Sequence, residues 1–169
     1  MHPRRLAHAG QGFTLLELLV VMAIIGALIG VIGYFSYRWT RTAQLREAAY
    51  QVITDLRRAR SQAQLTSSSS LMTLCSSTGA ACSTSDTSSS PVYSTAWGGT
   101  GSGTRSLPYG VQIRNSVGGN SVTYTAPYAE VDAPTGTVWT LTSPVNGVAP
   151  LYIKVVGVTG KVSLSASLN

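Results

Sequence analysis

The chain has very little of what enzymes most often use for catalysis. Its two histidines, His2 and His8, both lie close to the amino terminus, so the rest of the sequence lacks the commonest general base. Serine is abundant, but no serine lies in the Gly-x-Ser-x-Gly pattern of a nucleophile elbow. We therefore expect no enzyme activity, no catalytic residue and no cofactor.

Cysteine is equally scarce, since Cys75 and Cys82 are the only two. They lie in a stretch rich in serine, threonine and glycine. Outside the cytoplasm the pair could close a small disulfide loop, whereas in a reducing compartment the two would remain free thiols. A metal site fits poorly, because two thiolates need further ligands. The sequence therefore leaves a disulfide and free thiols open and predicts no metal site.

Acidic residues are also few. Twelve Lys and Arg stand against six Asp and Glu, which gives a formal net charge of +6. Six arginines lie between Arg38 and Arg60, against only Glu47 and Asp55. Such a balance fits nucleic acid or anionic lipid as a partner. It equally fits a solvated helix face that meets acidic neighbours in an assembly.

No proline occurs between Pro3 and Pro91, so one helix can run unbroken from Phe13 to about Leu65. Residues 18–33 carry no charged or strongly polar side chain. With the apolar residues on either side, this run reaches the roughly 20 residues that span a bilayer. A cleaved Sec signal peptide and an ordinary signal anchor are the alternatives. Neither explains Glu17, a carboxylate near the start of the run that a bilayer disfavours.

The second half of the expected helix is amphipathic. Its apolar residues recur at helical spacing and form one stripe, while charged and amide side chains occupy the other faces. A stripe of this kind docks a helix on a globular domain. The stripe consists of Leu45, Ala49, Val52, Leu56, Ala59 and Ala63.

The remainder of the chain predicts a β-rich head. Short runs of β-branched and aromatic residues are typical of strands. Two of them, 151–156 and 161–166, flank a Gly157-Val158-Thr159-Gly160 turn and predict a hairpin. Residues 76–90 and the glycine-rich segment 98–103 are expected to be exposed, flexible loops. The other expected strands are 71–74, 92–94, 111–113, 122–124, 138–141.

The start of the chain resembles the class III signal of type IV pilins and type II secretion pseudopilins. The resemblance rests on a short basic head, Arg4 and Arg5, on the segment Gly12-Phe13-Thr14-Leu15-Leu16-Glu17, and on the apolar run that follows to Phe35. It implies that a prepilin peptidase cuts after Gly12 and that Phe13 is then N-methylated. It also implies that Glu17 pairs with the amino terminus of a neighbouring subunit in a filament.

Two segments in the head narrow the resemblance. Leu107–Val111 and Gly157–Val162 are similar to the minor pilins grouped with pseudopilin H and FimT. The fold this implies is α+β, with a long amino-terminal helix packed on a small, antiparallel, β-sandwich-like head. Many major pilins carry a proline in the mature helix, and its absence here favours a minor subunit.

The resemblance also implies an organisation and a location. Residues 1–12 are the leader, 13–36 the transmembrane and filament-core helix, 37–66 the helix docked on the head, and 71–169 the head. Such a subunit is first a single-pass protein of the bacterial inner membrane. It then joins a periplasmic or cell-surface filament, a type IV pilus or a secretion pseudopilus. Its partners are the prepilin peptidase and other pilin or pseudopilin subunits.

DNA binding is the alternative function, because some FimT-like minor pilins take part in DNA uptake. The candidate phosphate contacts in the head are Arg105, Arg114, Lys154 and Lys161. Four aromatic residues could stack on bases, although aromatic residues in strands more often lie in the core. They are Tyr109, Tyr124, Tyr128 and Trp139.

Glu130 and Asp132 form the only close acidic pair in the expected head. With backbone carbonyls they could bind calcium. Such a pair more often forms an exposed turn, here before Pro134.

Overall fold

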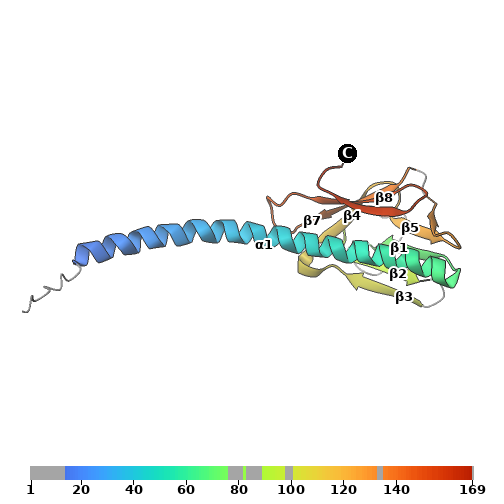
Figure 1. The fold of residues 1–169 in the computed structure, drawn as a ribbon, viewed down its shortest axis with the longest axis horizontal. Helices are drawn as coiled ribbons and strands as arrows, with labels where there is room; N and C mark the ends of the chain where they lie inside the picture. The colour runs from blue at the N-terminus through green and yellow to red at the C-terminus, as the bar shows by residue number, and fades with distance from the viewer. Residues whose placement is uncertain (1–13, 76–81, 83–88, 98–100, 133–134, 169) are drawn as a thin grey trace, which may run out of the picture. The chain divides into compact units, whose positions relative to one another are not determined.

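The structure, a computed structural model, describes residues 14–75, 82, 89–97, 101–132 and 135–168. It divides the chain into two units, Met1–Arg38 and Trp39–Asn169. A long helix begins in the first unit and is followed in the second by strands and one short 3-10 helix (Figure 1). The elements are α1 (Leu15–Thr66), β1 (Ser70–Leu74), β2 (Val92–Trp97), β3 (Gly101–Ser106), η1 (Pro108–Gly110), β4 (Gln112–Val117), β5 (Ser121–Thr125), β6 (Glu130–Val131), β7 (Thr137–Thr142), β8 (Leu151–Val156) and β9 (Lys161–Ser165).

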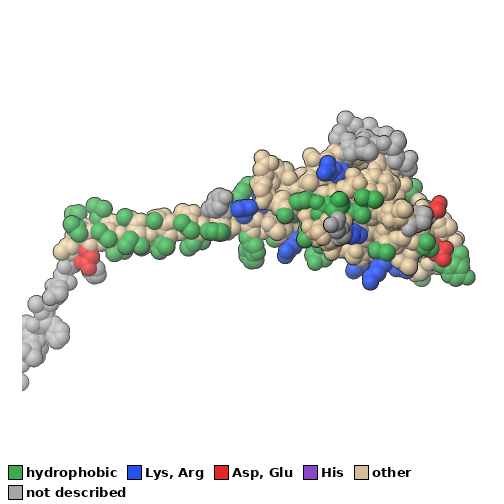
Figure 2. Space-filling view, turned by 90° about the horizontal axis from the view of Figure 1, so that it is seen from above, with side chains coloured by type: hydrophobic (Ala, Val, Ile, Leu, Met, Phe, Trp, Pro, Cys, Tyr) green, Lys and Arg blue, Asp and Glu red, His purple; other side chains and the backbone are tan. Residues whose placement is uncertain are grey.

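The described part of the first unit is the start of α1, and its side chains are almost all apolar. Every large hydrophobic residue from Leu15 to Ile32 is exposed. Figure 2 shows apolar side chains along this part of the helix. The helix continues without a break through Gly26, Gly30 and Gly33. Apolar side chains that find no partner within their own unit need either lipid or other helices around them.

The second unit contains two antiparallel sheets. One has the strand order β3-β2-β1-β5-β6, and the other has the order β4-β7-β8-β9. The predicted hairpin is confirmed, since β8 pairs with β9 from Tyr152↔Ser165 to Val156↔Lys161. The second half of α1 runs alongside the strands (Figure 1). One long helix packed on antiparallel sheets is the α+β arrangement that the sequence predicts.

The predicted stripe of α1 faces the core. Its six residues are at most 1% exposed, and Ala48 and Ile53 are buried beside them. They share one core with side chains from both sheets, among them Tyr93, Tyr124 and Trp139. Periodicity therefore located the docking face of the helix correctly.

A polar network also joins α1 to the sheet. The Tyr93 hydroxyl on β2 donates to Asp55 Oδ2 at 2.7 Å, and Gln51 Nε2 donates to the Tyr93 hydroxyl at 3.1 Å. Arg105 on β3 places its Nη1 3.5 Å from Asp55 Oδ1. Asp55 is only 4% exposed, so the tyrosine and the arginine supply the partners that a buried carboxylate needs. The network fixes which turn of α1 lies against β2 and β3.

Two loop predictions are wrong in part. Residues 101–103 were expected in a flexible loop, but they begin β3 and pair with β2 from Trp97↔Gly101 to Thr95↔Gly103. Glycine has low strand propensity, and here the pairing with β2 overrides it. Ser90 was expected in an exposed loop, yet it is buried and its backbone exchanges hydrogen bonds with Ile113. Most of the loop expected at 76–90 lies outside the described residues.

The two cysteines form a disulfide. Cys75 follows β1 directly, is 2% exposed, and donates its backbone N–H to the Val92 carbonyl at 3.1 Å. The bridge therefore anchors Cys82 to a buried position at the end of β1. Of the two states that the sequence left open, the structure contains the oxidised one.

We expect the head to lose stability at alkaline pH. Burial raises the pKa of Tyr124 to about 12, and burial together with the Asp55 hydrogen bond also raises the pKa of Tyr93. Above pH 10, the ordinary tyrosine pKa, the unfolded chain loses these protons while the folded head keeps them. The free energy of unfolding should therefore fall from about pH 10 to 12, by up to about 1.4 kcal/mol per pH unit for each tyrosine.

Denaturant unfolding at neutral and rising pH measures this effect. Tyr124→Phe removes one of the two groups, so the slope of stability against pH should become shallower. A head whose stability does not change between about pH 10 and 12 would contradict the burial of these hydroxyl groups.

Candidate functional site

The first turn of α1 is closed by Thr14. The Glu17 backbone N–H donates to Thr14 Oγ1 at 3.3 Å, and the Leu18 N–H donates to the Thr14 carbonyl at 3.2 Å. Thr14 therefore acts as the N-cap of the helix. Thr-x-x-Glu is also the sequence pattern of a capping box, so the start of this helix could have been predicted from the sequence. The two residues of the expected cleavage site, Gly12 and Phe13, lie outside the described residues.

Glu17 is the only charged residue between Thr14 and Tyr37. It lies in the first turn of α1, where its negative charge is favoured by the helix dipole. Its side chain is exposed, and its neighbours along the helix are apolar. In a bilayer or among packed helices, such a carboxylate requires a positively charged partner.

The described residues contain one helix, α1, that is long and apolar enough to cross a membrane by length and composition. None of its most apolar stretch is buried. Gly26 and Gly30 have the G-x-x-x-G spacing at which transmembrane helices approach closely, and a Cβ added at either would meet nothing within 4 Å. This spacing is visible in the sequence alone. The start of α1 thus has the length to span a bilayer and small residues for packing against another helix.

The four candidate DNA contacts fall on different sheets. Arg114, Lys154 and Lys161 lie on β4, β8 and β9. The residues next to them, Ile113, Ile153 and Val162, are buried, and side chains alternate along a strand. The three basic side chains therefore share the outward face of one sheet, whose strands contain no acidic residue.

Arg105 is not part of that group. It lies on β3 of the other sheet and pairs with Asp55. Two of the four candidate stacking residues are also excluded, because Tyr124 and Trp139 are fully buried. Tyr109 and Tyr128 are exposed. The structure thus brings three of the predicted cations together and leaves the fourth in the contact between α1 and β3.

Tyr152, which was not among the predicted site residues, lies on the same outward sheet face as Arg114, Lys154 and Lys161. It is half-buried and pairs with Thr140 on one side and with Ser165 on the other. The position of Tyr152 on this face follows from the strand register, which the sequence alone does not give.

The acidic pair of the head is exposed. Glu130 lies in β6, which pairs with β5 through Thr125↔Glu130, and Asp132 follows that strand directly. Within the ranges that the structure describes, no group of three His, Cys, Asp or Glu residues is placed to hold a metal ion. These two carboxylates therefore remain surface charges in the structure.

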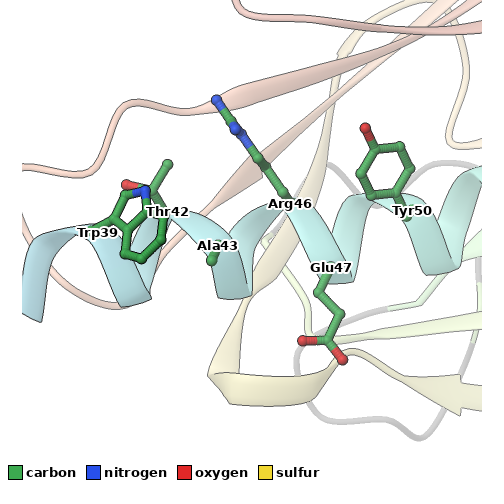
Figure 3. Close-up of a pocket in the computed structure, with 6 residues that line it drawn as sticks. All are labelled: Trp39, Thr42, Ala43, Arg46, Glu47 and Tyr50. Carbon is green, nitrogen blue, oxygen red and sulfur yellow. The ribbon is translucent and has the colours of Figure 1, made fainter. Parts of the chain in front are cut away.

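An open groove of about 390 Å³ lies on α1 where the second unit begins (Figure 3). Two exposed aromatic residues, Trp39 at 79% and Tyr50 at 59%, stand toward its two ends. Arg46 and Tyr50 point to one side of the helix and Glu47 to the other. The Tyr109 hydroxyl donates to Glu47 Oε2 at 2.9 Å, which accounts for the direction of that side chain.

One comparison with known proteins gives a match. The prokaryotic N-terminal methylation motif matches residues 8–33, the region that contains the capped first turn, Glu17 and most of the apolar run. No curated protein and no solved structure matches the chain. The motif supports the class of type IV pilins and pseudopilins and, with it, a structural rather than an enzymatic subunit.

Proposed function

We propose that this chain is a structural subunit, a minor pilin or pseudopilin, of a type IV pilus or a type II secretion pseudopilus. The observation that carries the proposal is the coincidence of the methylation motif at residues 8–33 with a fully exposed apolar helix that contains a single carboxylate. In a helix that only anchors the chain in a membrane, the carboxylate of Glu17 would be unfavourable and without a role. In a subunit that leaves the bilayer and packs against other charged amino termini, the same carboxylate can form an ion pair.

In this proposal the prepilin peptidase removes residues 1–12, and Phe13 becomes the methylated amino terminus. Residues 13–36 hold the subunit in the inner membrane and later pack in the filament core. Residues 37–66 stay docked on the head, which comprises residues 71–169 and faces outward. Glu17 pairs with the Phe13 amino group of an adjacent subunit, while Gly26 and Gly30 allow neighbouring helices to approach closely.

The two segments that are similar to pseudopilin H and FimT, together with the unbroken and proline-free α1, support the minor class.

Processing gives the first test. The mature protein should begin at Phe13 and weigh one methyl group more than its sequence predicts. Gly12→Val should block cutting, because the proposed site requires a small residue there, and Gly12→Ala is the matched control that should still be cut. Intact-mass spectrometry of the membrane-extracted protein measures all three. A native chain that still begins at Met1 would overturn the proposal.

DNA binding is the second candidate, as in a minor pilin of a DNA-uptake pilus. It is favoured by the one sheet face that collects Arg114, Lys154 and Lys161 beside Tyr152. Three phosphate contacts to single-stranded DNA predict a slope of about −2 for log K against log salt. Lys154→Gln should make that slope shallower, whereas Arg105→Gln, on the other sheet, should not change it. Gel retardation over a salt series measures both, and no retardation even at low salt would remove this candidate.

A further inference from the structure

We infer that the outer edge of β9 (Lys161–Ser165) pairs with an extended, acidic segment of a partner protein, which adds a fifth strand to the sheet β4-β7-β8-β9. The partner segment is a peptide in which apolar residues alternate with Asp or Glu. The inference concerns the second unit alone and goes beyond the proposed function, because a structural subunit of a filament does not by itself require an unpaired sheet edge.

The two edges of this sheet differ. At the β4 edge, Ser90 exchanges two backbone hydrogen bonds with Ile113, at 3.0 and 2.8 Å, and the pairing of β4 with β7 shifts register between Asn115 and Val117. At the other edge, β9 pairs with β8 over five consecutive residues, and among the described residues no further backbone group bonds to Lys161–Ser165. One row of N–H and C=O groups on β9 can therefore bond to an added strand.

Strand β9 also lacks the features by which proteins protect exposed strand edges. Inward-pointing charges, proline residues and bulges serve that purpose. β9 contains no proline, and its single charge, Lys161, points outward, because the neighbouring Val162 is buried and side chains alternate along a strand. The other residues of the strand are valine, leucine and serine. This edge therefore permits pairing that a protected edge would prevent.

The apolar inner face of the sheet becomes less covered toward β9. Ile153 and Val155 on β8 are 0% and 2% exposed, whereas Val162 on β9 is 8% exposed. Leu164 is half-buried and packs against the margin of the core. An added strand with an apolar residue beside Leu164 would remove more of this side chain from water and would form backbone hydrogen bonds at the same time.

Charge determines which strand fits this edge. The outward face of the sheet carries Arg114, Lys154 and Lys161, and its four strands contain no acidic residue. Lys161 lies on the edge strand itself, so a carboxylate opposite it would form a cross-strand ion pair. A strand with apolar residues on the inner side and carboxylates on the outer side is therefore complementary to both faces of the sheet at β9.

The acidic residues of the other sheet limit where those carboxylates can lie. Glu130 and Asp132 line a pocket together with Val158, which belongs to the turn before β9. Because like charges repel, the partner should place its carboxylates between Lys161 and Ser165 and none beyond Lys161, next to the turn.

A second copy of the chain is the competing occupant, and its charges fit poorly. Strands β1–β9 contain a single acidic residue, Glu130, so a described strand of another copy cannot supply the alternating carboxylates. Two copies paired through β9 would also bring two basic sheet faces side by side, which is unfavourable. A strand from a different, acidic protein is therefore favoured.

Peptide binding to the full chain in detergent micelles tests the inference. The probe is a fluorescein-labelled peptide in which valine and glutamate alternate over about seven residues, the length of an ordinary strand. Binding is measured by fluorescence anisotropy. The same peptide with lysine in place of glutamate should bind about fivefold more weakly or worse, because it meets the basic face with like charge.

A peptide with N-methyl groups on all its backbone amides separates strand pairing from simple charge attraction. It keeps the side chains and the charge but cannot donate hydrogen bonds along either edge, so it should lose binding. In hydrogen exchange measured by mass spectrometry, the unmodified peptide should slow exchange in β9. It should leave exchange in β4 unchanged, because Ser90 already covers that edge.

Two adjacent substitutions locate the binding at β9. Leu164→Lys places a charge on the inner face, where an added strand would bury it, so the affinity for the peptide should fall about tenfold or more. Ser163→Lys adds the same charge on the outward face and should keep or raise the affinity. Lys161→Gln should lower the affinity by up to about fivefold. Thermal unfolding checks that each variant contains a folded head, and the methylated peptide tests the native chain whatever the variants do.

Four outcomes would overturn the inference. A folded native chain that does not bind the glutamate peptide has no such site. Equal binding of the methylated peptide would show that charge on the sheet face, and not the edge, holds the peptide. Equal binding of the lysine peptide would exclude an acidic partner. Dimers of the native chain that Leu164→Lys dissociates would assign β9 to a second copy. None of these results bears on the proposed function, which fails separately if the native chain begins at Met1.

Discussion

Val52→Asp should destabilise the head by about 4 kcal/mol or more, a large share of the 5–15 kcal/mol that stabilises a typical domain. Val52 is fully buried in the middle of the stripe that docks α1 on the sheets. A carboxylate at this position would lie among apolar side chains with no cation to pair with. The measurement is denaturant unfolding of a fragment that begins at Arg41, which lacks the apolar run and should be a soluble monomer.

Ser61→Asp is the matched control for this change. Ser61 lies on the same helix and is exposed, one turn beyond Arg57 and Arg58. A new carboxylate there should change stability by no more than about 0.5 kcal/mol. If Val52→Asp and Ser61→Asp unfold at the same denaturant concentration, the stripe does not hold the helix on the head in solution.

Glu17→Ala should abolish most incorporation into filaments while processing and abundance in the membrane stay normal. Membrane insertion loses an unfavourable charge, so it should not suffer. If Glu17 pairs with a neighbouring amino group as proposed, assembly loses that partner. Leaving one charge of a buried pair alone costs about 3–5 kcal/mol, a hundredfold or more in equilibrium terms. Filaments are sheared from cells, blotted for this subunit and compared with the membrane pool.

Glu17→Gln separates charge from helix capping. Glutamine preserves the capping-box pattern with Thr14, because Gln serves at that position as well as Glu, but it carries no charge. If pairing drives assembly, Gln and Ala should fail alike. If Gln assembles normally and Ala does not, the carboxylate serves the first turn of the helix, and the charge-pairing role is wrong.

The sequence predicted those parts of the fold that repeat. The docking stripe of α1 was evident from spacing alone, since Leu45, Val52 and Leu56 return to one face at every turn. The β8–β9 hairpin was evident from two β-branched runs around a glycine turn. Residues that are buried at regular intervals produce a hydrophobic periodicity that can be recognised in the sequence.

Contacts between distant segments could not be predicted in this way. Asp55 and Tyr93 are separated by 38 residues, and the sequence around either residue does not indicate the hydrogen bond between them. The grouping of Arg114, Lys154 and Lys161 depends on how four strands are ordered in the sheet. Strand β3 was missed because its glycines resemble those of a flexible loop.

The processing and assembly residues are a different case. Gly12, Phe13 and Glu17 were proposed from a short linear pattern, and the methylation motif at residues 8–33 overlaps that pattern. The roles proposed for these residues depend on a peptidase and on neighbouring subunits. Only the helix cap at Thr14, which lies within the chain itself, could be read from the fold.

Strand β3 has one further consequence, for how closely heads can crowd together. It is the outermost strand of its sheet, so one row of its backbone N–H and C=O groups has no strand partner among the described residues. Bare edges of this kind invite sheets on separate molecules to fuse into aggregates. Arg105 points its charge inward from this edge to Asp55, and a strand added there would have to bury that charge still further. Arg105 therefore disfavours the pairing of this edge with a strand of another molecule.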